Sequence, residues 1–416
     1  MITETKNNKA FINTKIPSDW QIVELNKCCD FITKGATPTT YGFEWTNNGV
    51  VFLRSECVSE RGLELKAAMF ISDEADRIMK RSSLHEGDIL MTITGNVGRV
   101  CQIPKGFPKA NINQHIARIR VRNDYSEKDY IFQYLKQEKI AKDYLKITTG
   151  QAYPQISLEQ VRNTSIPLPP LPEQKAIAQV LSTADAALHT TEKLIAQKEL
   201  RKKWLMQQLL IGKKRLKGFE GEVKLKLVEQ YLKEISERNK ELKVSNVLSV
   251  TNSKGFINQA DQFDRVVASE DATNYKIVRK GQFAYNPSRV NVGSLDLLRC
   301  FESGILSPMY VVFETDKSQL LPDYFYYQLK TQWFYGHIPM FVQGSVRDSL
   351  SFDGLCSMKF FIPSIEEQTA IAQVLQAADK EISLLKAKAE KLRKQKKGLM
   401  QVLLTGKVRL KINNMI

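Results

Sequence analysis

The chain contains one 45-residue segment twice. EQKAIAQVL at Glu173–Leu181 returns as EQTAIAQVL at Glu367–Leu375, and the basic stretch at 202–217 returns at 396–411. Both matches are offset by 194 positions (173 to 367, 202 to 396), and 22 of the 45 aligned residues are identical. Because solenoid repeats have much shorter periods, this period predicts two homologous halves in a pseudo-two-fold arrangement, which together nearly fill the 416 residues.

Each copy of the repeated segment has the boundaries of one long helix. Pro172 and Pro363 stand at the two beginnings, where proline and early glutamates are favoured. Gly212 and Gly406 stand at the two ends, where glycine commonly follows a helix. No proline lies between these boundaries, so we expect a helix of about 39 residues and about 58 Å in each half.

Apolar residues recur in these segments at alternating spacings of four and three, which is the heptad seam of a coiled coil. The natural partner of one seam is the other seam, and a two-fold relation makes the pair antiparallel. The alternative is two separate surface helices, each packed on its own domain. The predicted seam comprises Ile177, Leu181, Ala184, Leu188, Ile195, Leu205 and Leu209 in the first copy, and Ile371, Leu375, Ala378, Ile382, Leu385, Leu392, Leu399 and Leu403 in the second.

The segments between the repeats predict an α/β fold, with strands such as Gly87–Gly95 and Met309–Glu314 mixed with helices at Asp129–Leu145 and Asp323–Ile338. The two helices align at the same offset of 194, but most surrounding residues have diverged. This pattern predicts two modules of one fold that recognise different targets. The predicted organisation is a first recognition domain, a helical spacer, a second recognition domain and a second spacer, at 1–168, 169–217, 218–362 and 363–416.

The net charge of +16 suggests a polyanionic partner. Residues 173–217 hold ten Lys/Arg against four Asp/Glu, and residues 367–411 hold eleven against four, so most of the excess lies in the repeats. Cations at helix C-termini also complement the helix dipole, and both explanations can hold. The eight cations that could contact phosphate, or acidic patches on partner subunits, are Lys202, Lys203, Lys213, Lys214, Arg215, Lys396, Lys397 and Arg409.

No apolar run reaches membrane-spanning length, and MITETKNNKAF has no signal-peptide core, so we expect a cytoplasmic protein without a membrane partner. The six cysteines contain no CxxC pair and are expected to be reduced. The sequence has no GxxxxGK[ST] loop, no GxGxxG after a strand, and no His or Cys pair with metal-ligand spacing. We therefore predict no catalytic residue, no metal site and no cofactor bound by this chain.

PLPPLPEQKAIAQVL, followed by a helix ending in LLIGKKRL, resembles the conserved regions of specificity (S) subunits of Type I restriction-modification systems, and IPSIEEQTAIAQVL to LLTGKVRL matches the same pattern. KGATP, GDILMTITGNVGRV, NQHIARI and TGQAYPQIS resemble segments of the family's target recognition domains. GQFAYNPSRVNVG and GILSPMYVVF resemble another branch of those domains. The resemblance covers nearly the whole chain.

This resemblance implies two tandem mixed α/β target recognition domains, joined by two long helices that form an antiparallel intramolecular coiled coil. Each domain would read one half of a bipartite, asymmetric site in double-stranded DNA, and the coiled coil would set the gap. The expected partners are two adenine-N6 methyltransferase (M) subunits and restriction/translocase (R) subunits. S-adenosylmethionine and ATP with Mg would be used by those partners, because the S subunit itself is not catalytic.

Base reading requires polar side chains such as Arg, Asn and Gln on exposed loops. For any one of these residues the alternative role is a hydrogen bond that stabilises its loop. The DNA-binding candidates are Lys34, Thr37, Arg99, Asn113, Gln114, His115, Gln151, Tyr153 and Gln155 in the first domain, and Asn286, Ser288, Arg289, Asn291, Ser307, Gln343, Ser345 and Arg347 in the second.

Two other functions are alternatives. A coiled-coil scaffold that joins proteins predicts no sequence-selective DNA binding and leaves the diverged modules unexplained. A self-contained DNA methyltransferase or nuclease requires a cofactor loop or metal-binding acids. YNPSR at Tyr285–Arg289 lacks the second proline and the aromatic residue of an amino-methyltransferase signature, and Glu64 with Lys66 is too common a pair to indicate a nuclease.

Overall fold

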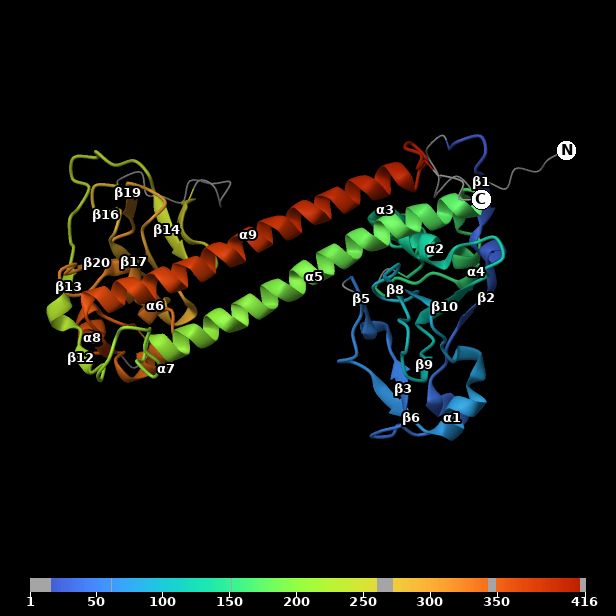
Figure 1. Ribbon diagram of the computed structural model, residues 1–416, viewed down its shortest axis with the longest axis horizontal. Coiled ribbons are helices and arrows are strands. Elements are labelled where there is room, and N and C mark those ends of the chain that lie inside the picture. Colours follow the sequence, from blue (N-terminus) through green and yellow to red (C-terminus); the bar gives the residue numbers. More distant parts are fainter. Residues whose placement is uncertain (1–15, 61, 151, 260–271, 343–348, 412–416) are drawn as a thin grey trace. The chain divides into compact units, whose positions relative to one another are not determined.

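In the computed structural model, which describes residues 16–60, 62–150, 152–259, 272–342 and 349–411, the chain divides into two units (Figure 1). Unit 1 contains Met1–Thr191 and Lys388–Ile416, and unit 2 contains Glu192–Ala387. Each unit thus combines one mixed α/β segment with part of both long helices.

Unit 1 is built on a four-stranded antiparallel sheet. The strand order is β2 (Cys29–Lys34), β10 (Ile116–Val121), β7 (Ile89–Thr92) and β8 (Val100–Gln102). Alternate residues of a strand point to opposite faces of the sheet. In β7 and β10, one set of residues packs into a core shared with the long helices, and the other set packs into a smaller core beneath the remaining strands.

The other strands of unit 1 form small sheets beside this one. A three-stranded sheet runs β6 (Met69–Ile71), β3 (Val50–Leu53) and β9 (Ala110–Ile112), with β3 and β9 parallel. Two antiparallel pairs are β1 (Gln21–Glu24) with β11 (Ser165–Leu168), and β4 (Val58–Ser59) with β5 (Gly62–Leu63).

The short helices of unit 1 are α1 (Asp73–Ile78), α2 (Lys128–Leu135), α3 (Glu138–Lys146) and α4 (Leu158–Arg162). The buried Tyr130 and Tyr134 of α2 donate their hydroxyls to the carbonyls of Pro167 (2.5 Å) and Ser165 (3.1 Å). These two bonds fix α2 to β11, the strand that leads into the first long helix.

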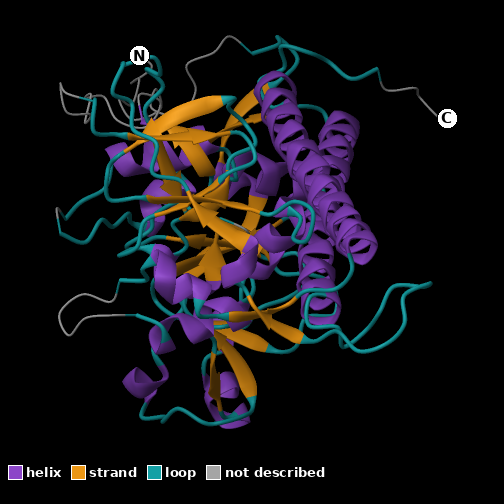
Figure 2. Ribbon diagram, turned by 90° about the vertical axis from the view of Figure 1, so that its left-hand side faces the viewer, coloured by secondary structure: helices purple, strands orange, loops and turns teal. Residues whose placement is uncertain are grey.

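Unit 2 repeats the four-stranded sheet of this plan, but its smaller sheets differ. Its four-stranded sheet has the order β13 (Leu232–Glu234), β20 (Val311–Thr315), β17 (Phe283–Tyr285) and β18 (Leu295–Leu297). The remaining pairs are β12 (Leu225–Leu227) with β21 (Lys359–Phe361), β14 (Leu248–Thr251) with β15 (Gly255–Asn258), and β16 (Lys276–Arg279) with β19 (Ser303–Leu306). In unit 2, which faces the viewer in Figure 2, the strands lie on one side of the long helices.

The short helices of unit 2 are α6 (Pro322–Leu329), α7 (Gln332–His337) and α8 (Phe352–Cys356). Their starting positions match those of α2, α3 and α4 at the offset of the repeat, since 322 − 128, 332 − 138 and 352 − 158 all equal 194. The duplicated fold inferred from the sequence is therefore confirmed.

One sequence expectation about these helices was wrong. The helices expected as single elements at 129–145 and 323–338 are each two helices, α2 with α3 and α6 with α7. The chain turns at Gln137 and Thr331, whose extended backbones begin the second helix of each pair, and the Thr331 hydroxyl accepts from the amide of Phe334. A capped restart of this kind permits a change of direction without proline.

The long helices are α5 (Leu171–Leu209) and α9 (Ile365–Leu403), each of 39 residues. The core of unit 1 contains Ile177 and Leu181 from the beginning of α5 together with Leu403 from the end of α9. The core of unit 2 contains Leu209 from the end of α5 together with Ile371 from the beginning of α9. The helices are therefore antiparallel in both units, as the coiled-coil prediction required, and both helices also pack on the α/β folds.

Inward-facing positions continue along both helices between these ends. The predicted residues Ala184, Leu188, Ile195, Leu205, Ala378, Leu385, Leu392 and Leu399 are half-buried, and Leu375 and Ile382 are buried. The polar positions Thr191, Lys396 and Lys202, which continue the four-three spacing, are also buried or half-buried. No helix in the described part of the chain has the long apolar stretch that a membrane span requires.

Candidate nucleic-acid interface

Five of the candidates in the first domain line one hollow of about 370 Å³ in unit 1: Thr37, Asn113, Gln114, His115 and Tyr153. They come from three loops, which follow β2, join β9 to β10, and join α3 to α4. The first two loops meet because β2 pairs with β10. Gly35 permits their close approach, since a Cβ at this position would lie 1.7 Å from the carbonyl oxygen of Ile112.

Two candidate residues that line this hollow are joined by a hydrogen bond. Thr37 Oγ1 donates to Gln114 Oε1 at 2.7 Å, and both side chains are half-buried. The bond orients the amide and leaves its Nε2 as a donor and the second lone pair of Oε1 as an acceptor. A side-chain amide with one donor and one acceptor available matches the major-groove edge of adenine.

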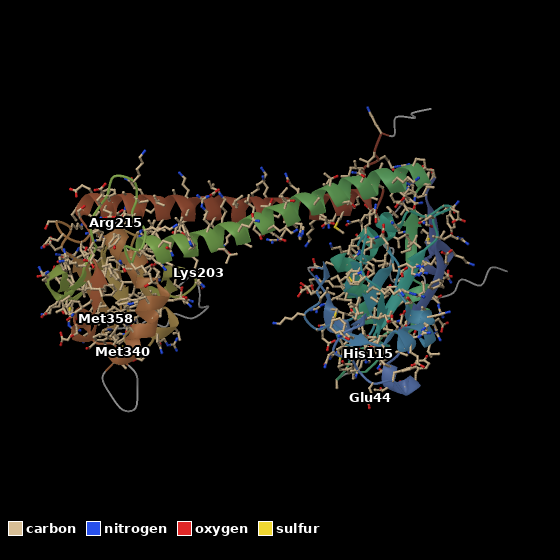
Figure 3. All side chains as sticks on the ribbon, turned by 60° about the horizontal axis from the view of Figure 1, so that its bottom comes forward. Glu44, His115, Lys203, Arg215, Met340 and Met358 are labelled. Atoms are coloured by element: carbon tan, nitrogen blue, oxygen red, sulfur yellow. The ribbon has the colours of Figure 1, made fainter. Side chains whose placement is uncertain are left out.

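The other three side chains of the hollow differ in role. Asn113 is buried, and its Oδ1 accepts from the amide of His115 at 3.2 Å, so its side chain stabilises the loop. His115 lines the hollow, and Figure 3 shows it at the end of unit 1 remote from α5. Tyr153 is 63% exposed and presents its ring at the hollow.

The remaining candidates of the first domain lie elsewhere. Lys34 is exposed at the end of β2, and Gln155 has an exposed side chain while its backbone pairs with Thr149. Arg99 lines a separate hollow of about 590 Å³ beside α3 and lies 3.8 Å from the carboxylate of Glu60. Gln151 lies outside the described residues.

The same hollow as Gln114 contains residues that the sequence did not single out. Trp45 packs edge-on against Phe52, with ring centroids 5.1 Å apart, and Arg54 pairs with Glu56 at 2.7 Å. In the sequence, these two residues could have been noticed only as a tryptophan in a loop and an arginine directly after a strand. Their convergence depends on the parallel pairing of β3 with β9, which local sequence patterns do not encode.

The sequence also did not single out two arginines of β10, the buried Arg118 and the half-buried Arg120. The guanidinium groups of Arg118 and Arg120 lie 4.5 Å and 4.9 Å from the ring centroid of Phe31 on β2. Burial lowers the pKa of Arg118 to about 10, and the nearby Asp88 carboxylate opposes this shift. Arg118 donates to the backbone carbonyl of Arg81 at 2.7 Å and Arg120 pairs with Asp88 at 2.7 Å, so both cations have partners within the fold.

In unit 2, the turn between β17 and β18 carries four candidates. Asn286 is buried, and its Oδ1 accepts from the amide of Ser288 at 3.1 Å, which makes it a turn-forming residue. Ser288, Arg289 and Asn291 are exposed on the turn. Gly293 ends the turn with φ of 94°, a left-handed conformation that favours glycine.

A second turn, between β19 and β20, lies beside the first. Ser307 is half-buried there, and the neighbouring Met309 places its Sδ 3.5 Å from Asn286 Nδ2. Met309 and Met340 are strongly exposed, and Figure 3 shows Met340 at the end of unit 2 away from Arg215 and the long helices. The loop ends of the two units therefore carry different chemistry. Gln343, Ser345 and Arg347 lie outside the described residues.

Four of the eight candidate cations of the repeats are engaged with carboxylates at the long helices. Lys202 contacts Asp379 at 2.5 Å and Lys396 contacts Asp185 at 2.6 Å, in each case between α5 and α9. Arg215 and Arg409 contact glutamates at the helix beginnings. The other four cations do not pair with a carboxylate of the long helices in the described part of the chain. Lys397 pairs with Glu138 of α3, Lys214 lies over the ring of Trp204, and Lys203 and Lys213 are exposed.

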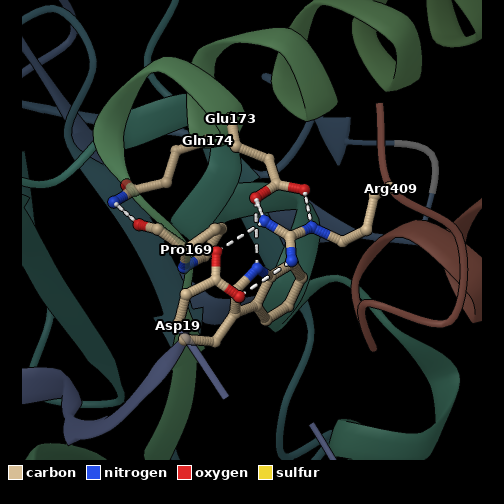
Figure 4. A network of polar contacts seen from close by, with 6 residues as sticks. Asp19, Pro169, Glu173, Gln174 and Arg409 are labelled. Carbon is tan, nitrogen blue, oxygen red and sulfur yellow. Dashed lines mark hydrogen bonds and ion pairs between the residues drawn. The ribbon is translucent and has the colours of Figure 1, made fainter. Parts of the chain in front are cut away.

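Arg409 occupies the centre of a polar network (Figure 4). It donates through Nε to Glu173 Oε1 at 2.6 Å and through Nη1 and Nη2 to the carboxylate of Asp19 at 2.8 Å and 2.7 Å. Trp20 Nε1 donates to the same Glu173 at 3.1 Å, and Gln174 donates to the carbonyl of Pro169 at 2.8 Å. The segment before β1 thus packs against the chain that follows α9.

No group of three His, Cys, Asp or Glu side chains among the described residues is arranged to hold a metal ion.

Comparisons with known proteins match this architecture. The family model described as the Type I restriction modification DNA specificity domain matches residues 17–199 and 302–394, which is more than half of the chain. The Type I restriction enzyme MjaVIII specificity subunit of Methanocaldococcus jannaschii is 25% identical, over 98% of this chain and 97% of the relative.

Two solved structures share the fold at low sequence identity. The crystal structure of the Type I restriction-modification S subunit from M. genitalium has a TM-score of 0.59 and 14% identity, over 97% of this chain and 98% of that one. A chain from a study of complex assembly and conformational transition of the type I R-M system has a TM-score of 0.55 and 15% identity, over 95% and 100%.

Proposed function

The chain belongs to the family of Type I restriction-modification DNA specificity subunits, and we propose that it selects the DNA sequence on which such a complex acts. Each recognition domain reads one half of a bipartite, asymmetric site. The coiled coil sets the gap between the halves and docks two adenine-N6 methyltransferase subunits, and restriction subunits join through the complex. The protein acts in the cytoplasm.

One observation carries this proposal. The four-stranded sheets of the two units have the same strand order and their short helices the same spacing, yet the loops differ: Gln114 and His115 in the loop before β10 have Pro308 and Met309 at the equivalent positions before β20. A duplicated framework with different polar loops is suited to reading two unlike sequences. A scaffold that only joins proteins has no need for this divergence.

We assign residues 1–168 and 218–362 as the recognition domains and residues 169–217 and 363–416 as the spacers. Within the domains, the exposed or half-buried candidates are the proposed base and phosphate contacts. Asn113 and Asn286 support their loops and act on DNA only through neighbouring residues. The same contacts would hold the domains in register on the duplex.

The chain supplies recognition and no chemistry of its own in this proposal. S-adenosylmethionine is bound by the methyltransferase subunits, and ATP with Mg is used by the restriction subunits.

A helix of 39 residues is about 58 Å long, which exceeds one turn of DNA, about 34–36 Å. The antiparallel pair is therefore long enough to serve as the spacer.

The experiment is to co-express the chain with its cognate methyltransferase subunit and to map N6-methyladenine across the host genome. We expect two unlike half-sites at one fixed gap, methylated only when both proteins are present. A stable complex of the two proteins that methylates no new motif would instead support the scaffold function. Binding of S-adenosylmethionine by the isolated chain would contradict the non-catalytic role.

A further inference from the structure

Unit 2 contains a hollow of about 700 Å³ where α7 meets the two long helices. An apolar part of its wall is formed by Trp333 of α7, Met206 of α5 and Ile211, which follows α5. Lys203 and Lys213 line the same hollow. Figure 3 shows Lys203 on α5 and Met340 at the end of unit 2 away from the long helices. Of the residues that the structure describes, none of the candidate base-reading residues of unit 2 lines it, whereas Lys202, Lys203 and Lys213 belong to the eight candidate cations of the repeats.

The cations of this hollow are unequally neutralised. Lys202 contacts Asp379 at 2.5 Å, Lys386 contacts Glu199 at 2.7 Å, and Lys330 donates to the carbonyl of Leu295 at 2.5 Å. By contrast, Lys203 and Lys213 form no ion pair with any residue in the described part of the chain. Within that part of the chain, two positive charges beside an indole ring remain without a counter-charge.

The equivalent place in unit 1 supplies its own counter-charge. Lys397, which is the counterpart of Lys203 in the second repeat, pairs with Glu138 at 3.1 Å. Glu138 begins α3 and also receives Lys142 at 2.6 Å. These hydrogen bonds from Lys142 and Lys397 lower the pKa of Glu138 to about 2, so the carboxylate is ionised at neutral pH.

In unit 2 the corresponding positions carry no charge. Gln332 stands at the start of α7 where Glu138 starts α3, and Gly336 stands where Lys142 would be. A Cβ at Gly336 would meet no atom within 4 Å, so the space beside α7 is open. Trp333 replaces Lys139, which in unit 1 pairs with Asp143 at 2.6 Å. A closed ion-pair network in unit 1 is thus an open apolar and cationic surface in unit 2.

We propose that this hollow docks a segment of the methyltransferase subunit that brings a carboxylate to Lys203 and an apolar side chain to Trp333, so that the two halves of the chain are unequal docking sites. The inference rests on the proposed function and adds the chemistry of the partner segment. The position of Glu138 in unit 1 indicates where the partner carboxylate would lie. An ion pair beside an apolar wall is partly shielded from water, which strengthens it.

A protein segment fits this hollow better than DNA. The backbone of a duplex contacts exposed cations on an open surface and gains nothing from a recessed indole. An apolar pocket with a few placed charges is typical of a protein contact, in which a buried aromatic residue supplies much of the binding energy.

The test is to titrate the full-length chain with its cognate methyltransferase subunit and to resolve the two binding steps by mass photometry and calorimetry. Gln332→Glu copies the carboxylate of unit 1 into unit 2. We expect it to weaken one binding step about tenfold or more, as loss of a shielded charge pair does, and to leave the other step unchanged. Gln332→Ala is the matched control, because it removes the same amide without adding charge, and it should change neither step by more than about twofold.

Lys203→Ser should weaken the same single step as Gln332→Glu. If Gln332→Glu leaves both steps unchanged in a chain that melts like the parent, the inference is overturned. The same holds if Gln332→Glu weakens only DNA binding by the chain alone, since the hollow would then be a phosphate contact. Failure of the unmodified chain to bind the methyltransferase subunit at all would contradict the proposed function, which is a distinguishable result.

Discussion

Arg409, which follows α9, donates to the buried carboxylate of Glu173 at the beginning of α5, with 2.6 Å between Nε and Oε1. The same relationship occurs in the other unit, where Arg215, which follows α5, donates to the buried Glu367 at the beginning of α9 with 2.5 Å between Nε and Oε1. Each helix is therefore attached at its start to the chain that leaves the other helix. Both residues of the Glu-Gln pair that the two repeats share therefore make structural contacts, since Gln174 and Gln368 also bond to backbone groups of their own units.

These contacts predict a loss of stability when either glutamate is neutralised. Glu173→Gln and Glu367→Gln each leave a guanidinium without its buried partner, and we expect a cost of about 1–3 kcal/mol. The measurement is the free energy of unfolding from urea titration. Glu366→Gln is the matched control, because Glu366 is exposed in the same helical turn as Glu367 and its neutralisation should cost clearly less. Equal effects of the control and of Glu367→Gln would contradict the account.

The contact between the helices in unit 1 predicts a pH dependence. Burial raises the pKa of Asp185, but Lys136, Gln133 and Lys396 outweigh burial and hold it below its ordinary value of 3.8. Because the folded carboxyl binds its proton more weakly than the unfolded one, its contribution to stability is present above that ordinary value and is lost as pH falls through the lowered pKa.

Asp185→Asn should therefore cost about 1–3 kcal/mol at neutral pH, where it leaves the buried Lys396 unpaired. Melting temperatures measured between pH 7 and strongly acidic pH should converge for the variant and the parent. A difference that is independent of pH would show that the ionised carboxylate is not the stabilising group.

The bond between Thr37 and Gln114 predicts a change of sequence specificity confined to one half-site. Gln114→Glu removes the amide donor and favours a base that donates to a carboxylate, such as cytosine. Thr37→Val removes the hydroxyl that orients Gln114 and should relax discrimination at the same position by about 1–3 kcal/mol. Methylome mapping would report both effects. A change in both half-sites, or in neither, would contradict direct reading by Gln114.

Variants that lose a phosphate contact and variants that lose a base contact should differ in how their DNA affinity depends on salt concentration. Lys34→Ala removes an exposed cation, so the slope of log K against log salt should fall by about one. Tyr153→Ala removes an exposed ring and should lower affinity at an unchanged slope. Fluorescence anisotropy with a duplex that carries the mapped site would measure both slopes. An unchanged slope for Lys34→Ala would remove this lysine from the interface.

The long helices were predictable because the repeat, the spacing of apolar residues and the terminal glycines Gly212 and Gly406 all indicate the same elements. The partners of Lys202 and Lys396 were not, since pairing with Asp379 and Asp185 depends on the register between two antiparallel helices that are distant in sequence. A single helix viewed alone shows these lysines only as polar interruptions of a seam.

The candidate interface was predictable only in part. Gln114 and Thr37 were chosen as candidates because polar residues follow strands there, but their mutual contact, which the structure shows, requires the approach that Gly35 permits. Trp45 and Arg54 were missed because pairing between β3 and β9 brings them to the hollow. The two α/β folds also begin at a different spacing. β2 starts at Cys29 and β13 at Leu232, and this separation (232 − 29 = 203) is larger than the repeat offset of 194. The repeat therefore did not align their first strands.

The most direct measurement inserts one heptad into each long helix, after Thr191 and after Ala387, where the two units meet in sequence. Each helix lengthens by about 10 Å, and the methylome of the variant is then mapped. The account predicts the same two half-sites, separated by a gap about one to three base pairs longer, because DNA rises about 3.4 Å per base pair. An unchanged gap, or altered half-sites, would contradict the claim that two independent readers are held apart by a helical spacer.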